Sequence, residues 1–92
     1  YPNPFNPSTQ IEFELPNPSI VTLKIYNMLG QEVATLLDHQ SLEDGLQSVE
    51  FNAGNLSSGV YFYRIAADQI VNEDDEVSAG SFVMTKKMLL VK

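Results

Sequence analysis

The feature that most restricts the fold is the run of residues 56–67, LSSGVYFYRIAA, in which a turn of small polar residues leads into aromatic and β-branched residues. This composition is typical of a strand in a buried sheet. With a side-chain period of two, one face carries Tyr61, Tyr63, Ile65 and Ala67, and the other carries Val60, Phe62, Arg64 and Ala66. Neither face is uniformly polar, so we predict a central strand. Tyr61 stands where small β-sandwiches bury a tyrosine ring whose hydroxyl reaches back to the backbone.

Further strand patterns, separated by turn signals, flank this run. They cover residues 10–15, 20–27, 31–37, 46–52 and 81–91. The residues expected to face inward on the first three are Ile11, Phe13 and Leu15, then Val21, Leu23 and Ile25, then Val33 with Leu37 or Leu36. The spacing between Leu46 and Val49 departs from two, which indicates a β-bulge. Six or seven short strands without helical periodicity predict an all-β fold, an immunoglobulin-like antiparallel β-sandwich.

The length and charge of the chain limit its class. Ninety-two residues predict a single domain, and because the chain does not begin with Met, we expect a piece of a longer protein. There is no cysteine, so neither a disulfide nor a thiolate metal site is expected. The net charge of −7 argues against nucleic-acid binding and against adsorption to anionic membranes. The sequence has no run of 18 apolar residues, so it predicts no membrane span.

The first nine residues, YPNPFNPST, hold three of the five prolines. Proline fixes its own φ and favours extended geometry in the residue before it. We therefore expect residues 1–9 to form an extended lead-in.

Two polar segments are the places where catalysis or metal binding could be sought. In residues 38–44, Asp38, His39 and Ser41 lie close in sequence, but sequence adjacency is not triad geometry and no oxyanion element accompanies them. In residues 68–79, carboxylates cluster without EF-hand spacing, so we expect an acidic loop at a hairpin tip. The only metal candidate is a weak calcium site formed by Glu73, Asp74, Asp75 and Glu76. We predict no enzyme and no cofactor.

The final strand pattern, residues 81–91, is apolar on both faces near its end. Met88 and Leu90 point one way and Leu89 and Val91 the other, and the sequence leaves open which pair is buried. Such a strand is either buried on both sides or offers a face or an edge to a partner. Three of the five basic residues lie within this strand or directly after it: Lys86, Lys87 and Lys92.

Several of these units together resemble one known family. YPNPFNPST, the strand with Ile11 and Phe13, the VxLxIYNxLG unit at 21–30, the SSGVYFYRI unit at 57–65 and the ending TKKMLLVK are similar to the C-terminal sorting domain of type IX secretion cargo, type A. The chain is also similar to the immunoglobulin-like domain of the flagellar hook-capping protein.

The resemblance implies a non-catalytic sorting signal at the end of a larger cargo protein. The cargo would be exported to the periplasm in transit and then pass through the outer-membrane translocon to the cell surface or the medium. The implied partners are the translocon and its shuttle proteins, a sortase-like protease that cuts near residues 1–5, and the upstream cargo domain. Residues 59–61 would give structural support. The implied recognition residues are Lys86, Lys87, Met88, Leu89, Leu90, Val91 and Lys92.

The chain departs from the family pattern at residues 68–79, where the family has a short turn, so we expect an inserted loop there. Two other functions stay open: a structural immunoglobulin-like spacer, and a carbohydrate-binding accessory module of a secreted enzyme. The second needs an exposed aromatic platform, for which Tyr26 and Phe62 are the plausible outward rings.

Overall fold

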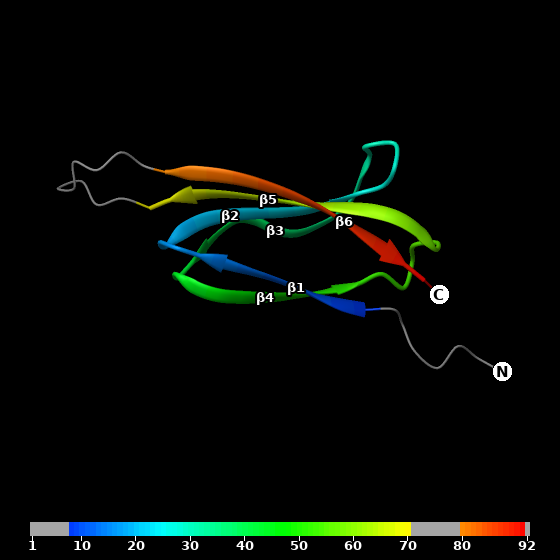
Figure 1. The fold of residues 1–92 in the computed structure, drawn as a ribbon, viewed down its shortest axis with the longest axis horizontal. Coiled ribbons are helices and arrows are strands. Elements are labelled where there is room, and N and C mark those ends of the chain that lie inside the picture. Colours follow the sequence, from blue (N-terminus) through cyan, green and yellow to red (C-terminus); the bar gives the residue numbers. More distant parts are fainter. Residues whose placement is uncertain (1–7, 71–79, 92) are drawn as a thin grey trace.

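The computed structural model describes residues 8–70 and 80–91, which form six β-strands in two antiparallel sheets (Figure 1). The strands are β1 (Ser8–Leu15), β2 (Ser19–Tyr26), β3 (Glu32–Leu42), β4 (Gly45–Asn52), β5 (Gly59–Gln69) and β6 (Ser81–Leu90). One sheet pairs β1 with β4, and the other has the order β3-β2-β5-β6. The two sheets pack face to face, which confirms the predicted all-β sandwich.

The core lies between the sheets and follows the alternation of the sequence. All the inward residues predicted for β1 and β2 are buried, and Leu15, Val21, Leu23, Ile25 and Ile65 are at most 1% exposed. Burying one such aliphatic side chain stabilises the fold by about 1.5–3 kcal/mol. Without disulfides, this packing supplies most of the stability.

β5 is the central strand that its composition predicts. It pairs with β2 on one side and β6 on the other. The Tyr61 ring is buried, and its hydroxyl donates a 2.8 Å hydrogen bond to the Ser57 carbonyl in the preceding turn. The predicted backbone contact of this tyrosine is therefore confirmed, and it ties the 53–58 connection to the core.

The turn between β2 and β3 is built by Asn27. Its side-chain oxygen accepts from the backbone N–H groups of Leu29 and Gln31, at 2.9 and 3.0 Å. Gly30 has φ +80°, the left-handed region that glycine enters without steric cost. The turn therefore depends on one side chain and one glycine.

β3 is longer than the sequence predicts. We expected it to end at residue 37, before the polar segment 38–44, which is wrong, because the strand continues to Leu42. The register changes between Val21 opposite Gln40 and Leu23 opposite Leu37, so two β3 residues oppose one of β2. At this bulge His39 has φ +51°. β3 is an edge strand with a wet face, which is why polar residues can continue it.

β4 contains no bulge. The bulge predicted between Leu46 and Val49 is wrong, since β4 pairs with β1 without a register shift. Leu46 points outward and is 70% exposed, while Gln47 takes the inward position. Its side-chain amide donates to the Glu43 carbonyl at 2.8 Å, so an inward polar residue is satisfied and the alternation stays intact.

Strand ends also differ from expectation. Ser8 and Thr9, expected in the lead-in 1–9, belong to β1, and residues 1–7 lie outside the described residues. Asp68 and Gln69, expected in the acidic loop 68–79, belong to β5, where Asp68 lies opposite Ser81. Residues 71–79 of that loop lie outside the described part of the chain. β6 ends at Leu90, one residue before the predicted end.

Candidate functional site

β6 is an edge strand. Among the described strands it pairs only with β5, in an unbroken register from Ser81 opposite Asp68 to Leu90 opposite Gly59. Its other side therefore presents backbone donors and acceptors that no described strand satisfies. Such an edge is a template for adding a strand from another chain.

The structure resolves which apolar pair of β6 is buried. Met88 and Leu90 pack against the core, because Met88 lies opposite the inward-facing Tyr61. Leu89 and Val91 point away and are 71% and 68% exposed. The four apolar residues among the implied recognition residues thus divide into two that hold β6 on the sandwich and two whose side chains are exposed.

The lysines of β6 are exposed on opposite sides of the strand. Lys87 lies opposite Phe62 on the outer face, and Lys86 lies opposite Tyr63 on the inner side. Lys86 reaches solvent there because the β1–β4 sheet has only two strands and cannot cover all four of the other sheet. Within residues 8–70 and 80–91, no carboxylate forms an ion pair with either lysine. Lys92 lies outside the described residues.

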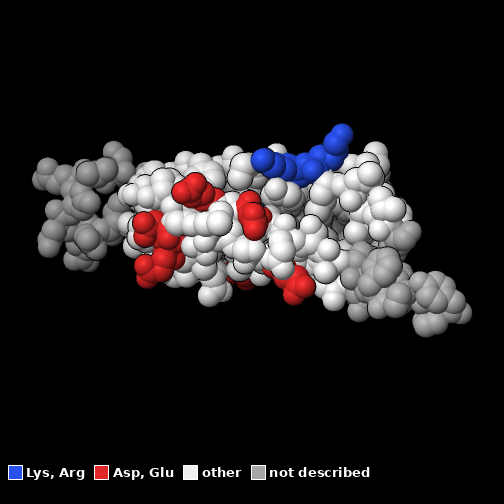
Figure 2. Space-filling view, turned by 60° about the horizontal axis from the view of Figure 1, so that its bottom comes forward, with Lys and Arg blue, Asp and Glu red and all other residues white. Residues whose placement is uncertain are grey.

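Charge is distributed unevenly over the sandwich. In Figure 2 the carboxylates are spread over the displayed face, and basic side chains form a short row along one margin. The outward residues of the β1–β4 sheet include Glu12, Glu14 and Glu50. Lys86 and Lys87, which pair with no carboxylate of the described residues, belong to the other sheet.

A cavity of about 260 Å³ opens where β1 begins and β6 ends, at the same end of the sandwich (Figure 1). It is lined by Ser8, Thr9, Phe51, Ala53, Met88, Leu89 and Leu90. Its walls come from both sheets, so the end of β6 forms one side of an apolar depression. A partner strand along the β6 edge could place a side chain there.

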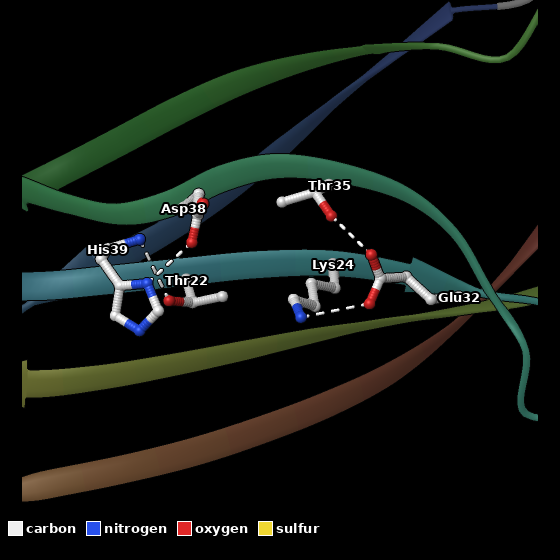
Figure 3. A network of polar contacts seen from close by, with 6 residues as sticks. All are labelled: Thr22, Lys24, Glu32, Thr35, Asp38 and His39. Atoms are coloured by element: carbon white, nitrogen blue, oxygen red, sulfur yellow. Dashed lines mark hydrogen bonds and ion pairs between the residues drawn. The ribbon is translucent and has the colours of Figure 1, made fainter.

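The histidine predicted to lie outside any triad has one polar side-chain contact. His39 Nδ1 lies 2.7 Å from Asp38 Oδ1, both side chains are more than 70% exposed, and the His39 N–H donates to Thr22 Oγ1 at 3.2 Å (Figure 3). No hydrogen bond joins Ser41 to His39 in the described structure. An exposed pair on an edge strand has no pocket for a substrate.

A second polar group lies on the outer face of β2 and β3 (Figure 3). Lys24 Nζ is 3.1 Å from Glu32 Oε1, and Thr35 Oγ1 donates to Glu32 Oε2 at 2.7 Å. The Thr35 hydroxyl and the Lys24 ammonium hold the pKa of Glu32 below its ordinary value, and the hydrogen bond to Glu32 raises the pKa of Lys24. Among the described cations of this face, Lys24 thus forms an ion pair, with Glu32.

Metal binding has no support in the described residues. Residues 8–70 and 80–91 contain no group of three potential ligands close enough to hold an ion. The calcium candidates Glu73, Asp74, Asp75 and Glu76 lie outside them.

Sequence reasoning missed the outer-face neighbours of β6. Tyr26, Phe62 and Lys87 form one cross-strand row, and Lys24, Arg64 and Thr85 form the next. The two outward rings considered for carbohydrate binding therefore lie side by side, both half-buried. Only the register of three strands could reveal this grouping, because its members are distant in sequence.

Comparison with known proteins gives one match. The family model described as the secretion system C-terminal sorting domain matches residues 1–74. The matched segment includes β1 to β5 and ends before β6. No curated protein and no solved structure matches significantly. In the part of the chain that the structure describes, no helix has the length and apolar character needed to cross a membrane.

Proposed function

Because this chain belongs to the family of secretion system C-terminal sorting domains, which act as sorting signals in type IX secretion, we propose that it carries a larger cargo protein through the outer-membrane translocon. Domains of this family are sorting signals and not catalytic domains. Export to the cell surface or the medium follows from family membership. Passage through the periplasm and contact with shuttle proteins and a sortase-like protease are parts of the proposal. So is the assignment of all 92 residues to one sorting domain.

The observation that carries the proposal is the β6 edge. The strand is held by the core through Met88 and Leu90, yet one of its backbone edges pairs with no described strand, and the side chains of Leu89 and Val91 are exposed. A signal that is read as a folded domain needs such a surface and no active site. We assign recognition to residues 86–92, with Lys86, Lys87 and Lys92 as the charged part and residues 59–61 as the structural support.

The test is an export assay in a bacterium with type IX secretion. Residues 1–92 are fused behind a signal peptide and a fluorescent cargo, and the fusion is compared with one that lacks residues 89–92. Export of the full fusion alone would support the proposal. Undiminished export of the shortened fusion, with a known cargo as the positive control, would contradict the assignment to β6.

One observation favours a second function, that of a carbohydrate-binding module. Tyr26 and Phe62 lie directly opposite each other on the outer face of the β2–β5 pair. Both rings are half-buried, so less of each face is open for stacking on a sugar than on a flat exposed platform. Retention of the chain on insoluble polysaccharide, lost in Phe62→Ser, would support this function instead.

A further inference from the structure

The outer face of β2, β5 and β6 carries an apolar cluster, which we call the outer-sheet patch. It consists of Tyr26, Val60, Phe62, Arg64, Lys87 and Leu89. Its β5 and β6 side is bordered by cations, and on its β3 side Glu32 lies opposite Tyr26 and pairs with Lys24. We infer that this patch extends the recognition surface of β6 across the outer face of the sheet and that it binds an acidic protein segment with apolar side chains, supplied by the export machinery. The inference rests on the proposed function for the origin of the partner, while the chemistry of the partner is argued from the patch itself.

The register of the sheet places the patch residues next to each other. Val60 lies opposite Leu89, Phe62 lies opposite both Tyr26 and Lys87, and Arg64 is two residues along β5 from Phe62. Side chains directly opposite on one sheet face have Cβ atoms about 5 Å apart. The patch is therefore continuous across three strands, and β6 supplies its outer border.

The apolar part of the patch is partly open to solvent. Leu89 is 71% exposed, and Val60, Phe62 and Tyr26 are half-buried. The other sheet packs on the opposite side of these strands, so no described element covers this face. Contiguous apolar surface with a polar border is a feature of protein interaction sites.

The charge of the patch is opposite to that of the molecule. Arg64 and Lys87 are exposed, and no carboxylate among the described residues forms an ion pair with them. Lys24, opposite Arg64, is paired with Glu32. Lys24 and Arg64 are like charges directly opposite each other, an arrangement that destabilises a sheet. Unpaired cations kept beside apolar side chains on a chain of net charge −7 thus point to a partner with carboxylates.

Two other occupants fit the patch less well. A second copy of the chain would bring another net charge of −7 to the interface, and the outer face of its β1–β4 sheet offers Glu12, Glu14 and Glu50 with a single large apolar side chain, Leu46. An anionic membrane would also repel the acidic body. A short acidic and apolar segment avoids both costs, because it can lie on the patch alone.

Binding is tested directly on the 92-residue chain labelled with ¹⁵N. The probe is a ten-residue peptide of alternating Glu and Leu, and the control peptide replaces each Glu by Lys. We expect saturable shifts of amides in residues 24–26, 60–64 and 85–89 with the acidic peptide only, weakened by salt. Absence of saturable shifts, shifts centred on the β1–β4 sheet, or the same patch shifting with anionic lipid vesicles instead would overturn the inference.

Matched variants separate the patch from unspecific effects. Leu89→Ser removes a patch residue, and Leu46→Ser removes an equally exposed leucine (70%) from the opposite face. Arg64→Gln removes one positive charge, and Gln10→Glu changes the net charge equally on the other face while keeping the acceptor of the Ser48 hydroxyl. We expect the two patch variants to bind the peptide about tenfold more weakly or worse, and the controls to bind as the unmodified chain does.

The same variants in the export assay distinguish this inference from the proposed function. Export of the unmodified fusion with loss in Leu89→Ser and Arg64→Gln, but not in the controls, supports both. Loss of export in Leu89→Ser with unchanged export of Arg64→Gln overturns the inference and leaves the sorting function in place, because Leu89 belongs to residues 86–92 and Arg64 does not. Export that is equal in all four variants overturns the inference as well. Failure of the unmodified fusion, while the peptide still binds the patch, overturns the function alone.

Discussion

Replacing Tyr61 by Phe removes one hydroxyl and leaves the buried ring in place. The lost group is the donor of the 2.8 Å hydrogen bond to the Ser57 carbonyl. Ser57 itself is exposed, so water can reach its carbonyl in the variant, and no acceptor is left buried without a partner. The cost is therefore the net value of one hydrogen bond, about 1 kcal/mol, and not the larger penalty of an unsatisfied buried group.

The expected loss is measurable by urea or thermal unfolding. For a domain of this size, about 1 kcal/mol lowers the melting temperature by roughly 4–8 °C. The control is Tyr63→Phe, because the Tyr63 hydroxyl makes no hydrogen bond to another described residue, and we expect this variant to unfold within about 0.5 kcal/mol of the unmodified chain.

Two results would refute this reasoning about Tyr61. Equal stability of Tyr61→Phe and the unmodified chain would mean that the hydroxyl bond adds nothing to the fold. Equal losses in Tyr61→Phe and Tyr63→Phe would mean that the effect belongs to any tyrosine hydroxyl on β5, and not to the contact with the 53–58 connection.

Three further predictions concern stability and can be checked by urea unfolding. Ile65→Ala should cost about 2–5 kcal/mol, because the side chain is fully buried on the central strand. Gly30→Ala should cost about 1 kcal/mol from backbone strain at φ +80° alone, since a Cβ there meets no atom within 4 Å. Because Thr35 and Lys24 lower the pKa of Glu32, its contribution is present above the ordinary value of 4.5 and is lost as the pH falls through the lower folded value. Glu32→Gln should therefore be less stable than the unmodified chain at neutral pH and equal to it in strong acid, and a difference that persists in acid would contradict the assigned cause.

Alternation in the sequence was enough to predict much of the core. β1 and β2 have one apolar and one mixed face, so the inward residues such as Phe13 and Leu23 follow from a period of two. The contact of Tyr61 was predictable for a different reason: it is local, since its hydroxyl binds a carbonyl only four residues away in the chain.

The errors arose where a strand is at an edge. β3 was predicted to end at 37 because its later residues are polar, but an edge strand with a wet face tolerates them, and the bulge at His39 realigns the pairing. In β4, Leu46 suggested an inward position, although it lies on the outer face. Propensity and hydrophobicity do not say which face a sheet's neighbours leave open.

The candidate site was only half predictable. The ending from Lys86 onward stands out in the sequence by its apolar character and its charge. The burial of Met88 rather than Leu89 depends on where the β1–β4 sheet lies. The addition of Arg64 to the outer-sheet patch depends on cross-strand register. These are tertiary facts, and a single sequence does not encode them in any local pattern.

The pairing of β1 with β4 has a consequence for the speed of folding. Ser8 lies opposite Asn52, and β2 and β3, which lie between β1 and β4 in the sequence, belong to the other sheet. Forming this ladder therefore closes a long loop that contains both of these strands. Closing a long loop costs entropy before any contact compensates it. Sandwiches dominated by such distant pairings fold in about milliseconds to seconds, far slower than helical bundles. The β2–β5 ladder, in which Ser19 lies opposite Gln69, joins residues that are still further apart in sequence, so these two ladders together are expected to limit the folding rate.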